Sequence, residues 1–137
     1  MSLPFFVYGT LRPGEINHAR FLHGRTRSAE PGRLRGAVLY DGPGYPYAVE
    51  DPGGVVYGDL VTALPEGYAR LLTELDRLEE YAPGDPRSLY ERVQRDVVRE
   101  TDGAAVPAWV YVAAPPVATE LRTRGKLIES GDWLCRG

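Results

Sequence analysis

Clusters of glycine and proline divide this chain into short segments, and this division limits what the chain can fold into. The sequence contains 16 Gly and 12 Pro among 137 residues, and both residue types favour turns over the interiors of helices and strands. Most of the segments between these clusters are short apolar or alternating runs, which are typical of strands. One longer segment has helical periodicity. The pattern predicts an α+β fold in which a small mixed sheet curls into a β-barrel with helices packed outside.

The expected strands are the apolar and β-branched runs that lie between turns. We expect strands at residues 3–8, 34–40, 45–49, 55–64, 90–100 and 108–114. The turn Asp51–Gly54 predicts that the strands on either side of it pair as a hairpin, and Asp102-Gly103 predicts a second hairpin. A short helix is expected over His18–Leu22, with Asn17 as its N-cap.

The main predicted helix covers Pro65–Tyr81 and carries one carboxylate in an unusual position. Its apolar residues recur at spacings of three and four and so form one stripe that faces the core. The members of this stripe are Leu64, Tyr68, Leu71, Leu72, Leu75 and Leu78. At about 100° per residue, Glu79 falls inside the stripe. The opposite face, which we expect to be solvated, carries Glu80, Asp76 and Thr73.

The position of Glu79 allows two interpretations. Burial disfavours the charged form of a carboxyl group and raises its pKa, and a carboxyl that titrates nearer neutral pH suits general acid–base chemistry. A structural glutamate, paired with an arginine or lying at the edge of the stripe, fits the helical wheel equally well. The wheel leaves both roles open.

The loop after the first strand is the second candidate part of a site. Gly9 lets a ligand approach the main chain closely, and Thr10 adds a hydroxyl group. Successive backbone N–H groups from Tyr8 to Leu11 can hold a carboxylate or a carbonyl oxygen, although the segment could also be a plain exit from the strand. Together with an inward Glu79, this loop predicts a site in which oxyanion donors face a base.

Other residues add little chemistry. Tyr45, Tyr81 and Tyr111 follow turns or lie on buried strands, so we expect them to shape the pocket wall. His18 and His23 are poorly spaced for a shared metal site. Neither metal-ligand clusters nor phosphate-binding or dinucleotide-binding loops occur in the sequence, so we expect no metal and no cofactor. Cys135, the single cysteine, cannot form an internal disulfide, and it is interpreted as a bystander thiol.

Charge and hydropathy narrow the range of partners. The net charge is −3 and the arginines are scattered, which argues against binding to a nucleic-acid backbone. The apolar runs are too short to span a membrane, and no basic segment precedes the first strand as in a signal peptide. We therefore expect a cytoplasmic protein with a small-molecule partner and neither a nucleic-acid nor a membrane partner.

Several short segments, taken in order along the chain, resemble the γ-glutamylcyclotransferase-like family, and within it the branch of γ-glutamylamine cyclotransferases and plant AIG2-like proteins. Each segment is short, but the ordered set spans nearly the whole chain. The segments are Phe6–Arg12, Gly44-Tyr45-Pro46, Val56–Leu60, Leu75–Tyr81, Tyr90-Glu91-Arg92, Trp109-Val110-Tyr111 and Gly131-Asp132-Trp133.

The resemblance implies one γ-glutamylcyclotransferase-like barrel domain over residues 1–137. It also implies that the loop Tyr8–Leu11 holds the glutamyl end of the substrate and that Glu79 is the catalytic base. Many members of the family carry glycine after the catalytic glutamate. This chain has Glu80 there, and a second carboxylate could crowd the site or alter the choice of substrate.

The implied reaction converts a γ-glutamyl amide to 5-oxoproline and releases an amine or amino acid, without a metal or cofactor. The alternative is a non-catalytic module that keeps the pocket for binding a small molecule or a partner. The sequence identifies neither the leaving group nor the oligomeric state nor the pathway.

Overall fold

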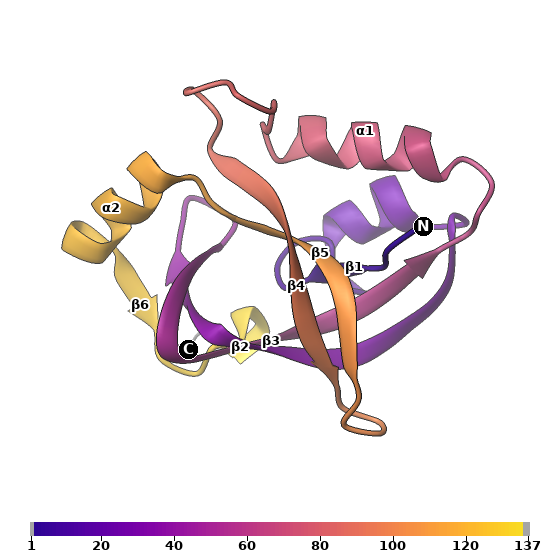
Figure 1. Ribbon diagram of the computed structural model, residues 1–137, viewed down its shortest axis with the longest axis horizontal. Helices are drawn as coiled ribbons and strands as arrows, with labels where there is room; N and C mark the ends of the chain where they lie inside the picture. Colours follow the sequence, from indigo (N-terminus) through magenta and orange to yellow (C-terminus); the bar gives the residue numbers. More distant parts are fainter. Residues whose placement is uncertain (1, 136–137) are drawn as a thin grey trace.

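The strands of the protein form a closed barrel, which is seen in a computed structural model that describes residues 2–135 (Figure 1). Around the ring the order is β3, β1, β5, β4 and β2, and β2 pairs with β3 to close it. β1 runs parallel to β5, whereas the other neighbours are antiparallel. The expectation of a small mixed barrel is confirmed. The strands are β1 (Phe5–Val7), β2 (Thr26–Asp41), β3 (Tyr47–Ala63), β4 (Tyr90–Arg99) and β5 (Ala105–Ala113).

The helices lie outside this ring. In Figure 1, α1 runs along one side of the barrel near β1 and η1, and α2 lies beside β6 near the bend of β2 and β3. β6 adds to the barrel by pairing with β2. These outer elements are η1 (His18–Leu22), α1 (Tyr68–Leu78), α2 (Pro115–Arg124), β6 (Lys126–Ile128) and η2 (Trp133–Cys135).

The segment Tyr47–Ala63 is one long strand and not the predicted hairpin. Residues 47–50 and residues 55–63 both pair with β2, in one antiparallel ladder with a register shift between them. The residues Asp51–Gly54 therefore form a bulge within β3. The hairpin prediction was wrong because β2 is long enough to pair with both halves. The second predicted hairpin is confirmed, since residues 90–98 of β4 pair with the whole of β5.

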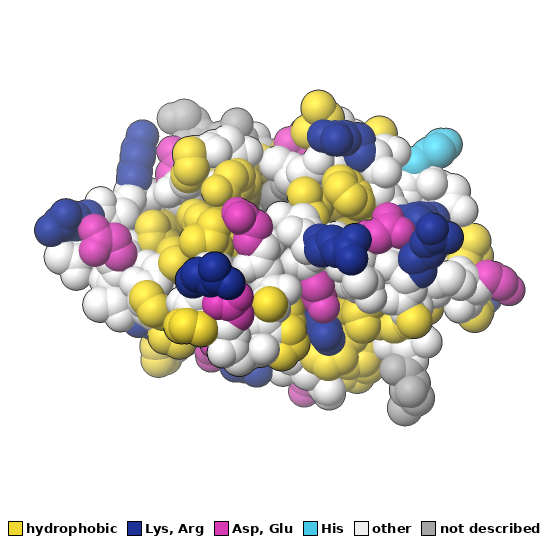
Figure 2. Space-filling view, turned by 90° about the horizontal axis from the view of Figure 1, so that it is seen from above, with side chains coloured by type: hydrophobic (Ala, Val, Ile, Leu, Met, Phe, Trp, Pro, Cys, Tyr) yellow, Lys and Arg dark blue, Asp and Glu magenta, His cyan; other side chains and the backbone are white. Residues whose placement is uncertain are grey.

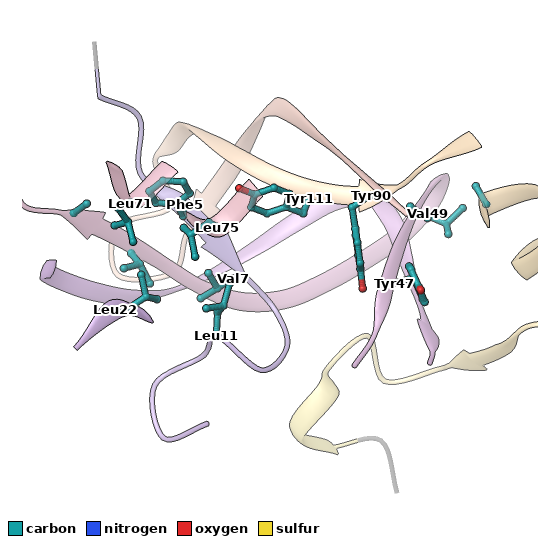
Figure 3. Close-up of a cluster of buried hydrophobic side chains, with 14 residues drawn as sticks. Phe5, Val7, Leu11, Leu22, Tyr47, Val49, Leu71, Leu75, Tyr90 and Tyr111 are labelled. Atoms are coloured by element: carbon teal, nitrogen blue, oxygen red, sulfur yellow. The ribbon is translucent and has the colours of Figure 1, made fainter. Parts of the chain in front are cut away.

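The helix α1 is shorter than the predicted Pro65–Tyr81. Gly67 has a left-handed backbone with φ of 76°, so the chain turns there and the helix starts at Tyr68. Leu71 and Leu75 are 2% and 0% exposed and belong to the same buried cluster as Phe5 of β1 (Figure 3). This packing fixes the position of α1 relative to β1.

β1 lies between two buried clusters because its side chains alternate. Phe5 and Val7 belong to the cluster beneath α1, whereas Phe6 belongs to the second cluster. The loop that follows β1 therefore starts from a strand that is held on both faces.

The face seen over α1 carries side chains of both charges, interspersed with hydrophobic ones (Figure 2). Within residues 2–135, no helix has both the length and the apolar character needed to cross a membrane.

Candidate active site

A cavity of about 250 Å³ opens where the loop after β1 meets the C-terminal end of α1. Its floor consists of buried side chains from β1, β4 and β5. Its exposed lining residues, Ile16, Gly44 and Glu80, form what we call the cavity mouth. The predicted site residues that line the cavity are Tyr8, Gly9, Thr10, Leu11, Tyr45, Glu79 and Tyr111.

Glu79 directly follows the last residue of α1, and its backbone N–H still donates to the carbonyl oxygen of Leu75 at 3.0 Å. Within residues 2–135 its carboxylate forms neither a hydrogen bond nor an ion pair. Desolvation by the surrounding side chains raises the pKa of Glu79 to about 7. At neutral pH this carboxyl group therefore exists in both protonation states, as an acid–base group requires.

The loop after β1 is held in place from two directions. A Cβ on Gly9 would lie 2.7 Å from Cδ of Pro46, so glycine permits a close approach that alanine would block. Asn17 donates from Nδ2 to Oγ1 of Thr10 at 2.8 Å and from its backbone N–H to the Thr10 carbonyl at 3.0 Å. The Asn17 side chain therefore holds this loop. The sequence had predicted that this side chain caps η1, but it forms no capping hydrogen bond.

The backbone donors of this loop are free of protein partners. The N–H groups of Gly9, Thr10 and Leu11 donate to no acceptor among residues 2–135. All three residues line the cavity. Free consecutive N–H groups of this kind suit a carboxylate or a developing oxyanion.

The hydroxyl group of Tyr8 connects strands and is not free for a ligand. It donates to the carbonyl oxygen of Tyr111 at 2.5 Å and accepts from the N–H of Ala48 at 3.2 Å. Burial, and then the nearby charge of Glu79, raises the pKa of Tyr8. The ring of Tyr8, and not its hydroxyl group, is the part that a ligand can contact.

Asp76 lies beside the cavity wall, although the helical wheel placed it on the solvated face. Its Oδ1 accepts hydrogen bonds from Oη of Tyr111 at 2.6 Å and from Nε of Arg92 at 2.9 Å. Arg92 also stacks on Trp109, with its guanidinium carbon 4.3 Å from the ring centroid. The prediction that Asp76 is solvated was wrong. The helical wheel gives only the direction of a side chain around the helix axis, and it does not show that β4 and β5 lie on that side of α1. Arg92 was not predicted as part of this network. The segment Tyr90-Glu91-Arg92 was one of those that carry the family resemblance, but its alternating pattern does not indicate which partners its side chains bind.

Tyr45, Tyr47 and Tyr90 form an aromatic cluster, and Tyr45 and Tyr90 line the cavity. Tyr45 lies edge-on to Tyr47. Tyr47 stacks on Tyr90, with ring centroids 4.7 Å apart, and both rings are labelled in Figure 3. Tyr90 lines the cavity and was not predicted, because alternation in a strand does not show which face turns inward. Tyr81 was expected in the wall, but it is not a lining residue. Its ring lies 5.8 Å from the guanidinium carbon of Arg92.

Glu80 has an uncommon backbone conformation. Its φ is 50°, and it is the only non-glycine residue with a positive φ in the described part of the chain. Its N–H donates to the carbonyl of Arg77 at 3.1 Å, and the N–H of Tyr81 donates to the carbonyl of Asp76 at 2.9 Å. This is the Schellman ending of a helix, in which glycine is favoured. The geometry accounts for the glycine that the resemblance associates with this position.

The histidines and the cysteine are not part of the cavity lining. Nδ1 of His18 lies 2.9 Å from the carbonyl oxygen of Leu11, and Cys135 is exposed. Among residues 2–135, no three or more His, Cys, Asp and Glu side chains come together as a metal site would require.

Comparison with known proteins places this barrel and its cavity in a family. The family model described as gamma-glutamyl cyclotransferase, AIG2-like, matches residues 5–135. The chain belongs to this family. The resemblance seen in the sequence is thereby confirmed.

Two curated relatives illustrate the range of the family. A Niallia circulans protein named gamma-L-glutamyl-butirosin B gamma-glutamyl cyclotransferase is 35% identical over 108 residues, and the match covers 78% of this chain and 64% of that protein. A Vibrio cholerae protein whose gamma-glutamylcyclotransferase name is provisional is 34% identical over 131 residues, with 96% of this chain and 95% of that protein covered.

Solved structures have the same fold. The aig2-like protein from Mus musculus is 26% identical with a TM-score of 0.62, and the match covers 83% of this chain and 80% of that one. The Escherichia coli protein ytfP is 28% identical with a TM-score of 0.63, and 98% of each chain is covered.

Proposed function

We propose that this protein is an enzyme that converts a γ-glutamyl amide to 5-oxoproline and a free amine or amino acid. One observation carries the proposal. The Glu79 carboxyl group lines the cavity without a protein partner, together with the free N–H groups of Gly9–Leu11, and its pKa is raised to about 7. Membership of the family and the names of the relatives support the reaction class.

In the proposed reaction the substrate supplies its own nucleophile. The α-amino nitrogen forms a bond to the γ-carbonyl carbon, and the bond from this carbon to the leaving nitrogen breaks. Glu79 takes one proton from the α-ammonium group, which frees the nucleophilic lone pair, and this proton is passed to the leaving nitrogen. The attacking nitrogen loses a second proton as the lactam N–H forms, and the released amine takes up a proton to become an ammonium ion, so that no water is consumed. Because both reacting groups belong to one molecule, holding it in a folded conformation removes much of the barrier.

The rest of the cavity is proposed to bind the glutamyl group. Among residues 2–135, no Lys, Arg or His lines the cavity, so the backbone N–H groups of Gly9–Leu11 are the proposed donors to the substrate. They would stabilise the oxygen that gains negative charge as the ring closes. The aromatic rings of Tyr8, Tyr90 and Tyr111 would exclude water and restrict the shape of the substrate.

Incubation of the protein with a panel of γ-glutamyl amides tests the proposal, with 5-oxoproline measured by liquid chromatography and mass spectrometry. We expect 5-oxoproline with wild-type protein, also in the presence of a chelator. We expect none when the α-amine of the substrate is acetylated, because the nucleophile is then blocked. Release of glutamate would mean hydrolysis and would contradict the mechanism. Binding of γ-glutamyl compounds without turnover would instead support the non-catalytic module.

A further inference from the structure

The cavity mouth carries a negative charge that the proposed chemistry does not use. Glu80 is exposed there, and within the described residues its carboxylate has no ion-pair partner. Its charge acts on the aromatic side chains beside the cavity, since Tyr47 contacts the lining residues Tyr45 and Tyr90. The pKa of Tyr47 is raised by burial first, then by Tyr45, and also by the charge of Glu80. Within the described part of the chain no Lys, Arg or His lines the cavity, so no described lining residue balances this charge.

The backbone of Glu80 gives a second, independent observation. A φ of 50° is strained for a residue with a Cβ, whereas glycine adopts it freely. The side chain of Glu80 does not compensate for this strain through a hydrogen bond or ion pair with residues 2–135. Strained residues of this kind cluster at functional sites, and this one lies at the entrance to the cavity.

The depth of the cavity gives the substrate one orientation. The glutamyl group must reach Glu79 and the N–H groups of Gly9–Leu11, which are buried or half-buried and so less exposed than the cavity mouth. The group attached to the γ-carbonyl must then extend toward solvent through the cavity mouth. There it passes Ile16, which is 69% exposed, and the charged side chain of Glu80.

We propose that Glu80 determines specificity for the leaving group and favours γ-glutamyl amides whose leaving amine carries a second, positively charged nitrogen. Monoamides of diamines and of other polycationic amines belong to this class. A leaving group with a distal carboxylate, as in a γ-glutamyl peptide, would be repelled. This inference rests on the proposed function and extends it to the substrate class.

Three γ-L-glutamyl amides of matched length test the inference. They are the monoamide of 1,4-diaminobutane, the neutral butylamide, and the amide of 4-aminobutyrate. For wild-type protein we expect kcat/KM to fall in this order, with steps of about threefold to fivefold, as is typical of one exposed charge pair. High salt should reduce the steps. Glu80→Gln should remove most of the preference, and Glu80→Lys should reverse it. Glu129→Gln, which removes an exposed carboxylate away from the cavity lining, should leave the order unchanged.

Binding of the same three amides to Glu79→Gln and to the double variant Glu79→Gln/Glu80→Gln, measured by calorimetry, separates the two proposals. A preference for the cationic amide that disappears in the double variant supports the role of Glu80 even without turnover. Turnover of all three amides with equal kcat/KM, or a preference that survives Glu80→Gln, would overturn the role of Glu80 and leave the proposed function intact. Neither turnover nor binding of any of the three amides would overturn both.

Discussion

Replacing Glu79 by glutamine should stabilise the protein, and the gain should depend on pH. The pKa of this carboxyl is about 7 in the folded protein against an ordinary value of 4.5. Because one pKa unit corresponds to about 1.4 kcal/mol, ionising Glu79 lowers the free energy of unfolding by at most about 3–4 kcal/mol. Opening of the cavity to solvent reduces this figure to about 2–3 kcal/mol.

The direction in which stability changes with pH follows from which state, folded or unfolded, binds the Glu79 proton more tightly. Between about pH 4.5 and pH 7 the folded protein holds the Glu79 proton while the unfolded chain loses it, so wild-type stability falls as the pH rises through this window. Below the window both states are protonated and the penalty vanishes. Glutamine is neutral throughout, so the advantage of Glu79→Gln should grow from near zero at acid pH to its full value at alkaline pH.

Urea unfolding followed by tryptophan fluorescence measures this difference at several pH values from 4.5 to 8.5. The m-value should not change, because the surface exposed on unfolding stays the same. Glu80→Gln is the matched control, since it removes a neighbouring exposed carboxylate and keeps the Cβ at the same strained position. Its effect should be within about 0.5 kcal/mol at every pH. If Glu79→Gln destabilises the protein by a constant amount, Glu79 has a structural role and the reasoning fails.

Three further substitutions probe the surroundings of the cavity. Gly9→Ala should lower kcat/KM by more than tenfold and the free energy of unfolding in urea by about 1–3 kcal/mol, because the new Cβ would lie 2.7 Å from Pro46. Wild-type kinetics and stability in this variant would contradict the close packing. Asp76→Asn should lower stability by about 1–2 kcal/mol and should reduce kcat more than it changes KM, because Tyr111 and Arg92 lose their charged acceptor; unchanged kinetics would limit the network to stability. Glu80→Gly should raise the melting temperature, with a gain of about 0.5–1 kcal/mol from relief of the positive φ; a lower melting temperature would show that the side chain contributes contacts.

Local patterns predicted the parts of the site that depend on spacing alone. Glu79 could be found because its angle on the helix follows from the positions of Leu71 and Leu75, which are both buried. The loop Tyr8–Leu11 could be found because it follows a buried strand directly, and because Gly9 lets a ligand approach its backbone N–H groups closely. The closed barrel followed from strand-rich composition and from the resemblance together.

Long-range contacts account for what the sequence did not predict. The partners of Asp76 lie 16 and 35 residues away, so the wheel could not show that a solvated angle was covered by β4 and β5. Tyr81 does not line the cavity as expected, and it follows the left-handed turn at Glu80 that ends the helix one residue earlier. The Pro- and Gly-rich segment Asp51–Gly54 suggested a turn locally, but pairing with β2 kept it within a strand.

The most direct test of the central claim is the rate of 5-oxoproline formation from a reactive γ-glutamyl amide by wild-type protein and by Glu79→Gln. The wild-type rate should rise with pH through about 7, where Glu79 loses its proton. Glu79→Gln should lower kcat by about 10²–10⁴-fold at every pH, as expected for the loss of a general acid–base group, while Glu80→Gln should retain most of the activity. A Glu79→Gln variant that keeps both the wild-type rate and the wild-type pH profile would contradict the assignment of Glu79 as the proton carrier.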